Sequence, residues 1–588
     1  INKLIDICLK SRKYNYTLCQ FMHYFYYMSK TQPDKPLLYP FDYKDIGDVK
    51  ASEIKQKTMK ILDDIDISPK KTKDGDFIIY QMEKLYEEYF DNVNYNILRY
   101  IKEVDGRIEV DKPFFDKILY DKLVYMIAIF EENKIPYNKT YLVYINKHNE
   151  NLVNKLYGFT HPIEHNLVKY NPKKSKKKTS QSYKRLSFKN KGVLSKIGNY
   201  KSYHYEQLND IQDANILGYK VKEGLLEDLP NKKIPKSIRQ STEGLARGVA
   251  KYALINYKLP HKTSNAFMKL WEIYSLVPQL VPRKKQLNVF HLAEAPGQWI
   301  NCTRHFIETK RQQVHHYNWL ANSLNPTHPT NIKKYGKGIF GDDYGFLKKY
   351  PQKWLFGEDG TGDITKTQNV RWFRDYMERF VKKGGQPIHL VTGDAGMVGD
   401  IELVELQKIE YAQMCMVAAT GSLGGNCVIK HFLHFINSYP NSYEGSGFMV
   451  NLIYVYYLMF EEVRLIKPHT SNPNSREFYL VGLKFRGIND DIINKLMKQL
   501  DNFKENDCFF KKDDVPESFY KQVIEFMNDI FTLNTNQYDV QTMLLTCIVN
   551  PDPVIEEATK CRKYLDDKFI KEIQSKRFKQ WIKTYKFE

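Results

Sequence analysis

Beyond residue 225 the chain alternates short apolar runs of strand-forming residues with amphipathic helical segments. This alternation is typical of a mostly parallel sheet that helices cover on both faces. We expect the clearest helix over 401–420, closed by Gly421 as its C-terminal cap. We expect strands over 288–293, 313–318, 388–393, 426–432, 462–467 and 477–485. The segment between the last two, PHTSNPNSR, is too short for a crossover helix, so we predict an α/β fold with a doubly wound sheet and an antiparallel edge strand.

The full chain of 588 residues is too long for one ordinary domain. Changes in residue pattern suggest a mixed or helical N-terminal domain of unknown role over 1–170, a basic linker over 171–225, the α/β domain over 226–487 and a helical C-terminal extension over 488–588. Between Lys173 and Lys191 the sequence holds nine basic residues and no acidic one. This run is either a solvated linker or an arm that follows a nucleic-acid backbone.

The charge balance narrows the classes of partner. Lys and Arg number 89 against 69 Asp and Glu, a formal charge of +20. Such an excess favours a polyanion, with an anionic membrane surface and simple solubility as the alternatives. No run of 18 apolar residues occurs, so we expect no membrane span. Eight cysteines without a CxxC pair predict neither a disulfide framework nor a zinc site, and we expect buried thiols in a reducing compartment.

The segment HLAEAPGQW, residues 291–299, is typical of the strand-to-helix turn that contacts ligands in such sheets. Ala295 and Gly297 let a ligand approach the backbone, Pro296 fixes the turn, and the next helix should begin near Trp299 with its amides facing the ligand. A phosphate-binding loop would be richer in glycine, and the GxGxxG fingerprint of nicotinamide-dependent enzymes is absent. Glu294 instead suits a cation, such as the ammonium and sulfonium groups of S-adenosylmethionine. Its alternative role is a structural cap.

A second acidic turn, FGEDGTGDIT, spans residues 356–365. Its glycines suggest a loop that lies against a flat group such as adenine, with Asp363 accepting from an exocyclic amine. The alternative is a plain surface turn, because Asp-Gly and Gly-Asp pairs are common there.

Four charged residues stand at positions where a sheet of this kind gathers side chains. Asp394 and Lys430 are placed at predicted strand ends, and Glu477 opens the last strand. Lys269 lies in the helical segment SNAFMKLWEIYSLV, off the apolar stripe of that helix. Each residue alone is unremarkable, but the combination is specific.

In order and local context these four residues resemble the Lys-Asp-Lys-Glu tetrad of the FtsJ-like family of RNA ribose 2′-O-methyltransferases. The segments that carry the resemblance are SNAFMKLWEI, LAEAPGQW, TGDAG, GGNCVIKHF and KPHTSNPNSREFYLVG, within residues 225–485. The resemblance implies a Rossmann-like methyltransferase sheet, S-adenosylmethionine as cofactor and no metal. It implies that the catalytic residues are Lys269, Asp394, Lys430 and Glu477, and that the cofactor-binding residues are Ser264, Glu294, Ala295, Pro296, Gly297, Gln298, Trp299, Asp363 and Ile364.

Two features depart from the family pattern. Gln298 stands where the family usually has a second glycine, and its side chain could narrow the methionine end of the pocket. An acidic residue that would bind the cofactor ribose is not evident after the second strand, where the sequence offers Asn318 and Asn322.

The resemblance is greatest to enzymes that methylate the first nucleotide of capped messenger RNA, because SNPNSRE and DGTGDITKTQNVRWF are similar to segments of that branch. It implies methyl transfer to a ribose 2′-hydroxyl with Lys430 as the base, and a substrate loop over 431–448. Alternatives are action on ribosomal or transfer RNA, and a non-catalytic RNA-binding scaffold or processivity subunit. We expect capped RNA as partner, contacts with capping or transcription machinery through the two extensions, no membrane, and a cytoplasmic, virion or viral-factory location, with a nuclear one left open.

Overall fold

The computed structural model describes residues 101–104, 107–110, 140–159, 161–167, 188–203, 205, 222, 225–226, 229, 231–242, 263–336, 341–382, 387–396, 402–433, 445–549 and 560–587. The chain forms two compact units. The first consists of Ile1–Leu156, Leu217–Ser241 and Asp539–Phe569, and the second of Tyr157–Ile216, Thr242–Tyr538 and Ile570–Glu588. In the first unit β1 (Ile101–Val104) and β2 (Arg107–Val110) form an antiparallel pair.

The second unit contains a sheet in the order β3-β9-β10-β8-β7-β4-β5-β6. Its strands are β3 (Ile163–Leu167), β4 (Gln286–Leu292), β5 (His316–Asn322), β6 (Trp354–Leu355), β7 (Leu390–Gly393), β8 (Asn426–Phe432), β9 (Phe460–Lys467) and β10 (Glu477–Phe485). The strands from β6 to β8 in this order pair in parallel, whereas β10 is antiparallel to β8 and β9, and β3 is antiparallel to β9. The chain leaves β4 toward β5 on one side and returns to β7 on the other, which creates a topological switch point between β4 and β7.

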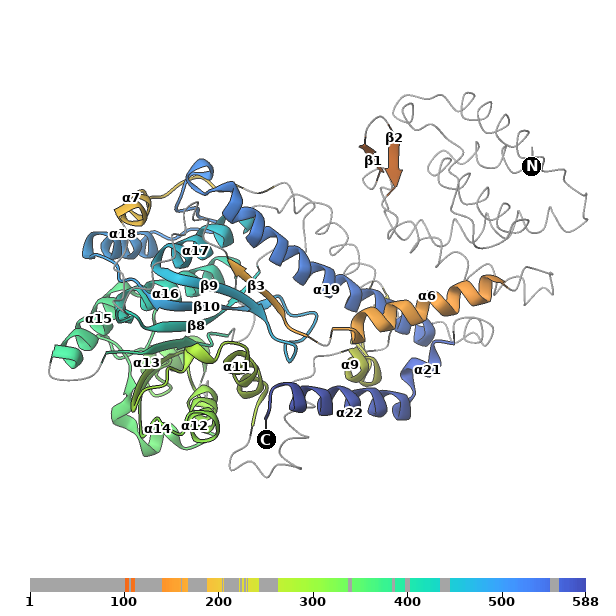
Figure 1. Ribbon diagram of the computed structural model, residues 1–588, viewed down its shortest axis with the longest axis horizontal. Coiled ribbons are helices and arrows are strands. Elements are labelled where there is room, and N and C mark those ends of the chain that lie inside the picture. Colours follow the sequence, from red (N-terminus) through yellow and green to blue (C-terminus); the bar gives the residue numbers. More distant parts are fainter. Residues whose placement is uncertain are drawn as a thin grey trace, which may run out of the picture. The chain divides into compact units, whose positions relative to one another are not determined.

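Helices cover both faces of this sheet. The longer helices of the described residues are α6 (Thr140–Tyr157), α11 (Asn265–Leu276), α12 (Gln298–Lys310), α15 (Thr367–Lys382), α16 (Leu403–Thr420), α17 (Gly445–Met459), α18 (Asp490–Asp501), α19 (Glu517–Val549) and α22 (Asp567–Thr584). Of these, α6 up to Leu156 and the end of α19 belong to the first unit. The shorter helices are α7 (Phe188–Leu194), α9 (Lys236–Thr242), α13 (Pro329–Tyr335), α14 (Phe346–Lys349) and α21 (Arg562–Leu565), of which α9 up to Ser241 and α21 belong to the first unit. Figure 1 shows α16, α17 and α18 on one side of the sheet and α11 and α12 on the other.

Successive residues of the central strands enter opposite cores. In β4, Val289 packs into the core beneath α11 and α12, while Phe290 packs into the core beneath α15, α16 and α17. In β7, Leu390 packs into the first of these cores and Val391 into the second. A strand buried on both faces needs apolar residues at every position, which explains why these strands are continuous apolar runs in the sequence.

The predicted fold class is confirmed, with local differences. β5 begins at His316 instead of 313, because the amides of His315 and His316 both donate to the Lys285 carbonyl and turn the chain before the strand. The short strands β3 and β6 were not predicted. Gly421 caps α16 as expected, and its amide donates to the Val417 carbonyl.

The second unit does not follow the boundaries inferred from the sequence. Residues 161–167 supply its edge strand β3 although the pattern assigned them to the N-terminal domain, and α18 and the beginning of α19 bury apolar residues in its core although they follow residue 487. Most of the basic run, up to residue 187, lies outside the described residues, as do residues 434–444 of the expected substrate loop.

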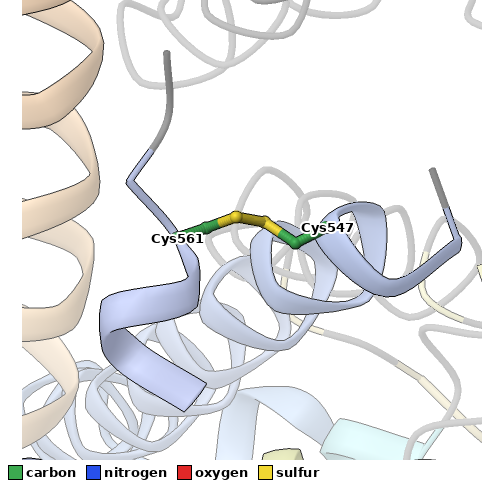
Figure 2. The surroundings of a disulfide bond; sticks show 2 residues. All are labelled: Cys547 and Cys561. Carbon is green, nitrogen blue, oxygen red and sulfur yellow. A yellow bond between two sulfur atoms is a disulfide. The ribbon is translucent and has the colours of Figure 1, made fainter. Parts of the chain in front are cut away.

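The cysteines differ in part from the expectation of reduced thiols. Cys302, Cys415, Cys427 and Cys508 are free and buried. In the first unit, however, a disulfide joins Cys547 near the end of α19 to Cys561 before α21 (Figure 2). The 14-position separation left no recognisable spacing motif in the sequence. Within the described ranges, every helix is too short or too polar to cross a membrane.

Candidate active site

The four charged residues singled out in the sequence meet at one edge of the sheet. Asp394 follows β7, Lys430 lies two residues before the end of β8, and Glu477 is the first residue of the antiparallel strand β10. Lys269 comes from α11, where its neighbours on both sides are buried and it is only partly so. Parallel strands end at a common edge, so residues far apart in sequence converge there.

Asp394 and Lys430 form the first ion pair of this edge. The Lys430 Nζ lies 2.8 Å from Asp394 Oδ1 and also donates to the Asp394 carbonyl at 3.2 Å. The ammonium lies 5.6 Å from the centre of the Phe432 ring. The amine is therefore held by one carboxylate and one carbonyl, and its side chain stays 10% exposed, so it can still meet a substrate.

Lys269 and Glu477 form the second ion pair. In the antiparallel register Glu477 is opposite Phe432 and Tyr479 is opposite Lys430, so Glu477 and Lys430 project from the same face as diagonal neighbours. Burial alone would raise the pKa of Glu477, but the charges of Lys269, Lys467 and Lys430 lower it to about 2. The carboxylate is therefore ionised at neutral pH, and both pairs share one electrostatic environment.

A third lysine lies behind the second pair. Lys467, the last residue of β9, is completely buried. Its Nζ donates to Ser471 Oγ at 2.9 Å, to the Ser475 carbonyl at 2.6 Å and to the Glu477 carbonyl at 3.2 Å. Ser471 in turn donates to Glu477 Oε1 at 2.7 Å. Burial lowers the pKa of Lys467 to about 7, with Lys269 acting in the same direction and Glu477 opposing.

Sequence reasoning missed Lys467 and Ser471. A signal was present, because Lys467 ends an otherwise apolar strand and Ser471 lies in the polar stretch before Glu477. Lysine is rarely buried without a partner, so a lysine at the end of a core strand indicates a polar network around it.

In the turn after β4, the Glu294 carboxylate binds groups of the protein itself. Glu294 Oε1 accepts from the amides of Trp299 and Ile300 at 2.7 and 3.0 Å, and Oε2 lies 3.8 Å from His291 Nδ1. Only 1% of the Glu294 side chain is exposed. Burial raises its pKa well above the usual range, the charge of Asp394 adds to this, and the two amides oppose it. Glu294 is thus the helix cap that the sequence left open as an alternative, and the amides expected to face a ligand are those it occupies.

The small residues of this turn have packing roles as well. Ala295 donates its amide to Ser323 Oγ at 2.8 Å, and the peptide bond to Pro296 is cis. Gly297 has a φ of +113°, and a Cβ at this position would lie 2.6 Å from the Phe346 ring. The sequence suggested that a ligand approaches the backbone at Gly297, but the group that lies close to Gly297 is the Phe346 ring.

We expect Gly297→Ala to lower the free energy of unfolding of the second unit by about 1–3 kcal/mol, because both the positive φ and the Phe346 contact oppose a side chain. Urea unfolding can be followed by tryptophan fluorescence, since all six tryptophans lie in that unit. Gly192→Ala is the matched control, because an added Cβ there meets nothing within 4 Å. Equal midpoints for the two variants would contradict this account.

Three other predicted cofactor residues lie around the beginnings of α11 and α12. Ser264 caps α11 by accepting from the Phe267 amide, and its own amide donates to Gln298 Oε1 at 2.9 Å. The Gln298 side chain therefore ties the two helices together. Trp299 is buried, donates its indole N–H to the Ala266 carbonyl at 3.2 Å and packs near Tyr479.

The acidic side chains of the second turn, residues 356–365, form hydrogen bonds within the turn and with the residues just after it. Asp363 Oδ1 accepts from the amide and hydroxyl of Thr365, and Ile364 is buried in the core. Asp359 accepts from Lys366 Nζ at 2.7 Å and from Asn369 Nδ2 at 2.9 Å. Asp363 stays partly exposed at the loop surface, so it can still meet a ligand.

The two asparagines offered for a ribose have different positions. Asn322 ends β5, and its amide nitrogen donates to the Leu355 and Gly362 carbonyls, which joins β5 to the acidic turn. Asn318 lies near the beginning of β5 and donates to Asn288 Oδ1 at 3.3 Å, away from the carboxyl edge. Asn318 is therefore excluded as a residue of this edge.

The arrangement suits proton removal from a poorly acidic hydroxyl. It provides two amines, each paired with a carboxylate, in a partly buried site beside the switch point. Among the described residues, no group of three or more His, Cys, Asp or Glu side chains is arranged to hold a metal ion.

Comparison with known proteins gives the family of one segment of the chain. Residues 263–485, which carry this edge and its tetrad, match the FtsJ-like methyltransferase family. This segment is an FtsJ-like methyltransferase domain. The resemblance inferred from the sequence is confirmed. The FtsJ-like domain contains all four charged residues and all nine predicted cofactor residues, whereas β3, α18, α19 and α22 lie outside it.

Relatives of the chain are similar over this region. An uncharacterised protein of Acanthamoeba polyphaga mimivirus is 28% identical over 281 residues, covering 46% of this chain and 32% of the relative. The cap-specific mRNA (nucleoside-2′-O-)-methyltransferase 2 of Mus musculus is 28% identical over 269 residues, covering 44% and 32%. A probable methyltransferase of African swine fever virus is 28% identical over 293 residues, covering 45% and 62%. The match thus spans about a third of the first two relatives.

Proposed function

We propose that the FtsJ-like domain transfers a methyl group from S-adenosylmethionine to a ribose 2′-hydroxyl of RNA. The observation that carries the proposal is the meeting of Lys269, Asp394, Lys430 and Glu477 in two ion pairs at one sheet edge. Lys430 would accept the hydroxyl proton, Asp394 would orient its amine, and the Lys269–Glu477 pair would hold the ribose in place.

The residues at the edge fit the cofactor in part. S-adenosylmethionine supplies an electrophilic methyl group on a sulfonium centre. Asp363, which is partly exposed, is suited to its adenine amine. Ser264, Gln298 and the backbone of 295–297 would shape the methionine end. Glu294 would contribute by holding the beginning of α12 in place, because its Oε1 accepts from two amides of that helix.

We propose capped messenger RNA as the substrate, and the ribose next to the cap as the methylated position. The support is the similarity to a cap-specific methyltransferase, and the segments SNPNSRE and DGTGDITKTQNVRWF. The excess of 89 basic over 69 acidic residues favours a polyanionic partner.

The test is methyl transfer from labelled S-adenosylmethionine to short RNAs that are capped, uncapped, or capped and already methylated at the first or second ribose. We expect label on capped RNA, blocked by prior methylation at the target ribose, with the position mapped by nuclease resistance. Equal labelling of uncapped RNA would refute the cap preference and favour the ribosomal or transfer RNA alternative. Binding of RNA without methyl transfer to any of these RNAs would refute the enzymatic function and favour the RNA-binding scaffold.

A further inference from the structure

The C-terminal helix α22 and the residue directly after it place three residues on one stripe, spaced four apart. These residues are Arg577, Trp581 and Tyr585, and all three belong to the second unit. Their positions lie well beyond residue 485, where the family match ends. Only 1% of Trp581 and 5% of Tyr585 is exposed to solvent, so the stripe is packed against the protein.

The polar atoms of this stripe converge on one carboxylate. Glu272, completely buried on α11, accepts from the Trp581 indole N–H at 3.0 Å and from the Tyr585 hydroxyl at 3.2 Å. It also accepts from the His469 amide at 2.6 Å and from the Thr470 amide and hydroxyl at 3.0 and 2.9 Å. Burial raises the pKa of Glu272, and the hydrogen bonds from Trp581, His469 and Thr470 oppose the rise.

Glu272 connects the two segments that carry the second ion pair. It follows Lys269 by three residues, so it lies about one turn along α11. His469 and Thr470 begin the loop from β9 to β10, and that loop leads directly to Glu477. The geometry of the Lys269–Glu477 pair therefore depends on how Glu272 holds α11 against this loop.

Further contacts of α22 reach the same two segments. The Tyr585 carbonyl accepts from the Trp271 indole at 3.2 Å and from the Ser275 hydroxyl at 3.4 Å, both on α11. Arg577, which is buried, lies 3.3 Å from the His469 ring nitrogen. The stripe thus binds α11 through three residues and the loop through one.

We propose that Trp581 and Tyr585 are positioning residues of the methyltransferase site, which act through Glu272 to align Lys269 with Glu477. The expected effect on the rate rests on the proposed function. The expected shift of α11 or of the loop rests on the contacts alone. A buried carboxylate that loses a donor must find another, so α11 or the loop shifts. A displacement of about 1 Å in a catalytic group can cost roughly 10²-fold in rate.

The test compares Trp581→Phe, Tyr585→Phe and the double variant with Tyr200→Phe. Tyr200 donates its hydroxyl to the Lys196 carbonyl at 2.9 Å, and neither residue takes part in the Glu272 network, so the control loses one phenol hydrogen bond of a similar length. Activity is measured per folded molecule, with folding followed by tryptophan fluorescence. We expect kcat to fall about tenfold or more in the double variant, with KM for S-adenosylmethionine within about threefold of wild type.

A second readout does not need activity. Competitive acetylation of lysines, read by mass spectrometry, reports how well Glu477 shields the Lys269 amine, with exposed Lys498 as the internal reference. We expect faster labelling of Lys269 in the double variant and no change in Tyr200→Phe. Unchanged labelling, or an unchanged kcat per folded molecule, overturns the inference. An inactive wild type with the expected labelling would refute the proposed function and support the positioning role.

Discussion

Replacing Lys430 with alanine is expected to lower the rate of methyl transfer by about 10²- to 10⁴-fold, the usual contribution of a positioned general base. Lys430 Nζ is held at 2.8 Å by Asp394 and lies on the face shared with Glu477, so no neighbouring amine can replace it without moving. Binding of S-adenosylmethionine should change little, because the Lys430 amine contacts Asp394 and the Phe432 ring and not the turn after β4 or the acidic turn. Radiolabel transfer and calorimetric binding measure the two quantities separately.

Lys498→Ala is the control, because Lys498 is an exposed residue on α18 and its loss changes the net charge by the same amount. Retained transfer in Lys430→Ala would exclude this amine as the essential base. Loss of cofactor binding together with transfer would instead assign Lys430 to the binding of the cofactor.

Replacing Lys467 with methionine is expected to change how stability depends on pH. The pKa of Lys467 falls from about 10.4 in the unfolded chain to about 7 in the folded protein. Between these values the unfolded chain binds a proton that the folded chain does not, so wild-type stability rises with pH. The slope from this group is about 1.4 kcal/mol per pH unit, and methionine removes it. The difference between wild type and variant should therefore grow in favour of wild type from pH 7.5 to 9.5.

Urea unfolding followed by tryptophan fluorescence measures this difference in the second unit, since all six tryptophans belong to it. Comparing the two proteins at each pH removes the contribution of the buried tyrosines that both share. Lys498→Met, an exposed change of the same kind, should leave the pH dependence as in wild type. Parallel curves for wild type and Lys467→Met would show that Lys467 stays protonated in its network.

The meeting of Asp394 and Lys430 could be predicted because position in a parallel sheet limits where a side chain can go, whereas Lys269 and Glu477 were assigned through the resemblance to the FtsJ-like family. Asp394 and Lys430 stand at the ends of apolar strands, and such ends share an edge whatever the details of packing. The direction of the Glu294 side chain could not be predicted in this way. A carboxylate before a helix can turn outward to a ligand or inward to the helix amides, and the sequence leaves both open until packing decides.

The sequence also predicted that the α22 segment is helical, but it did not predict the role of this helix. Its apolar and aromatic stripe shows that the helix must be covered, but Trp581 and its partner Glu272 are 309 positions apart, and nothing local connects them. The edge strand β3 gave still less signal. Burial alternates along its five residues, but only Ile163 and Leu167 of them are apolar, so neither a continuous apolar run nor an apolar alternation marks the strand in the sequence.

This edge strand has a practical consequence for work on the protein. β3 pairs with β9 along its whole length, and Glu164 on it forms an ion pair with Arg464 of β9 at 2.9 Å. A shortened chain cut to residues 263–485 would leave the backbone amides and carbonyls of β9 without these partners. Such a bare edge can recruit the same edge of another molecule, so the trimmed protein is expected to self-associate and precipitate where the longer chain stays dispersed.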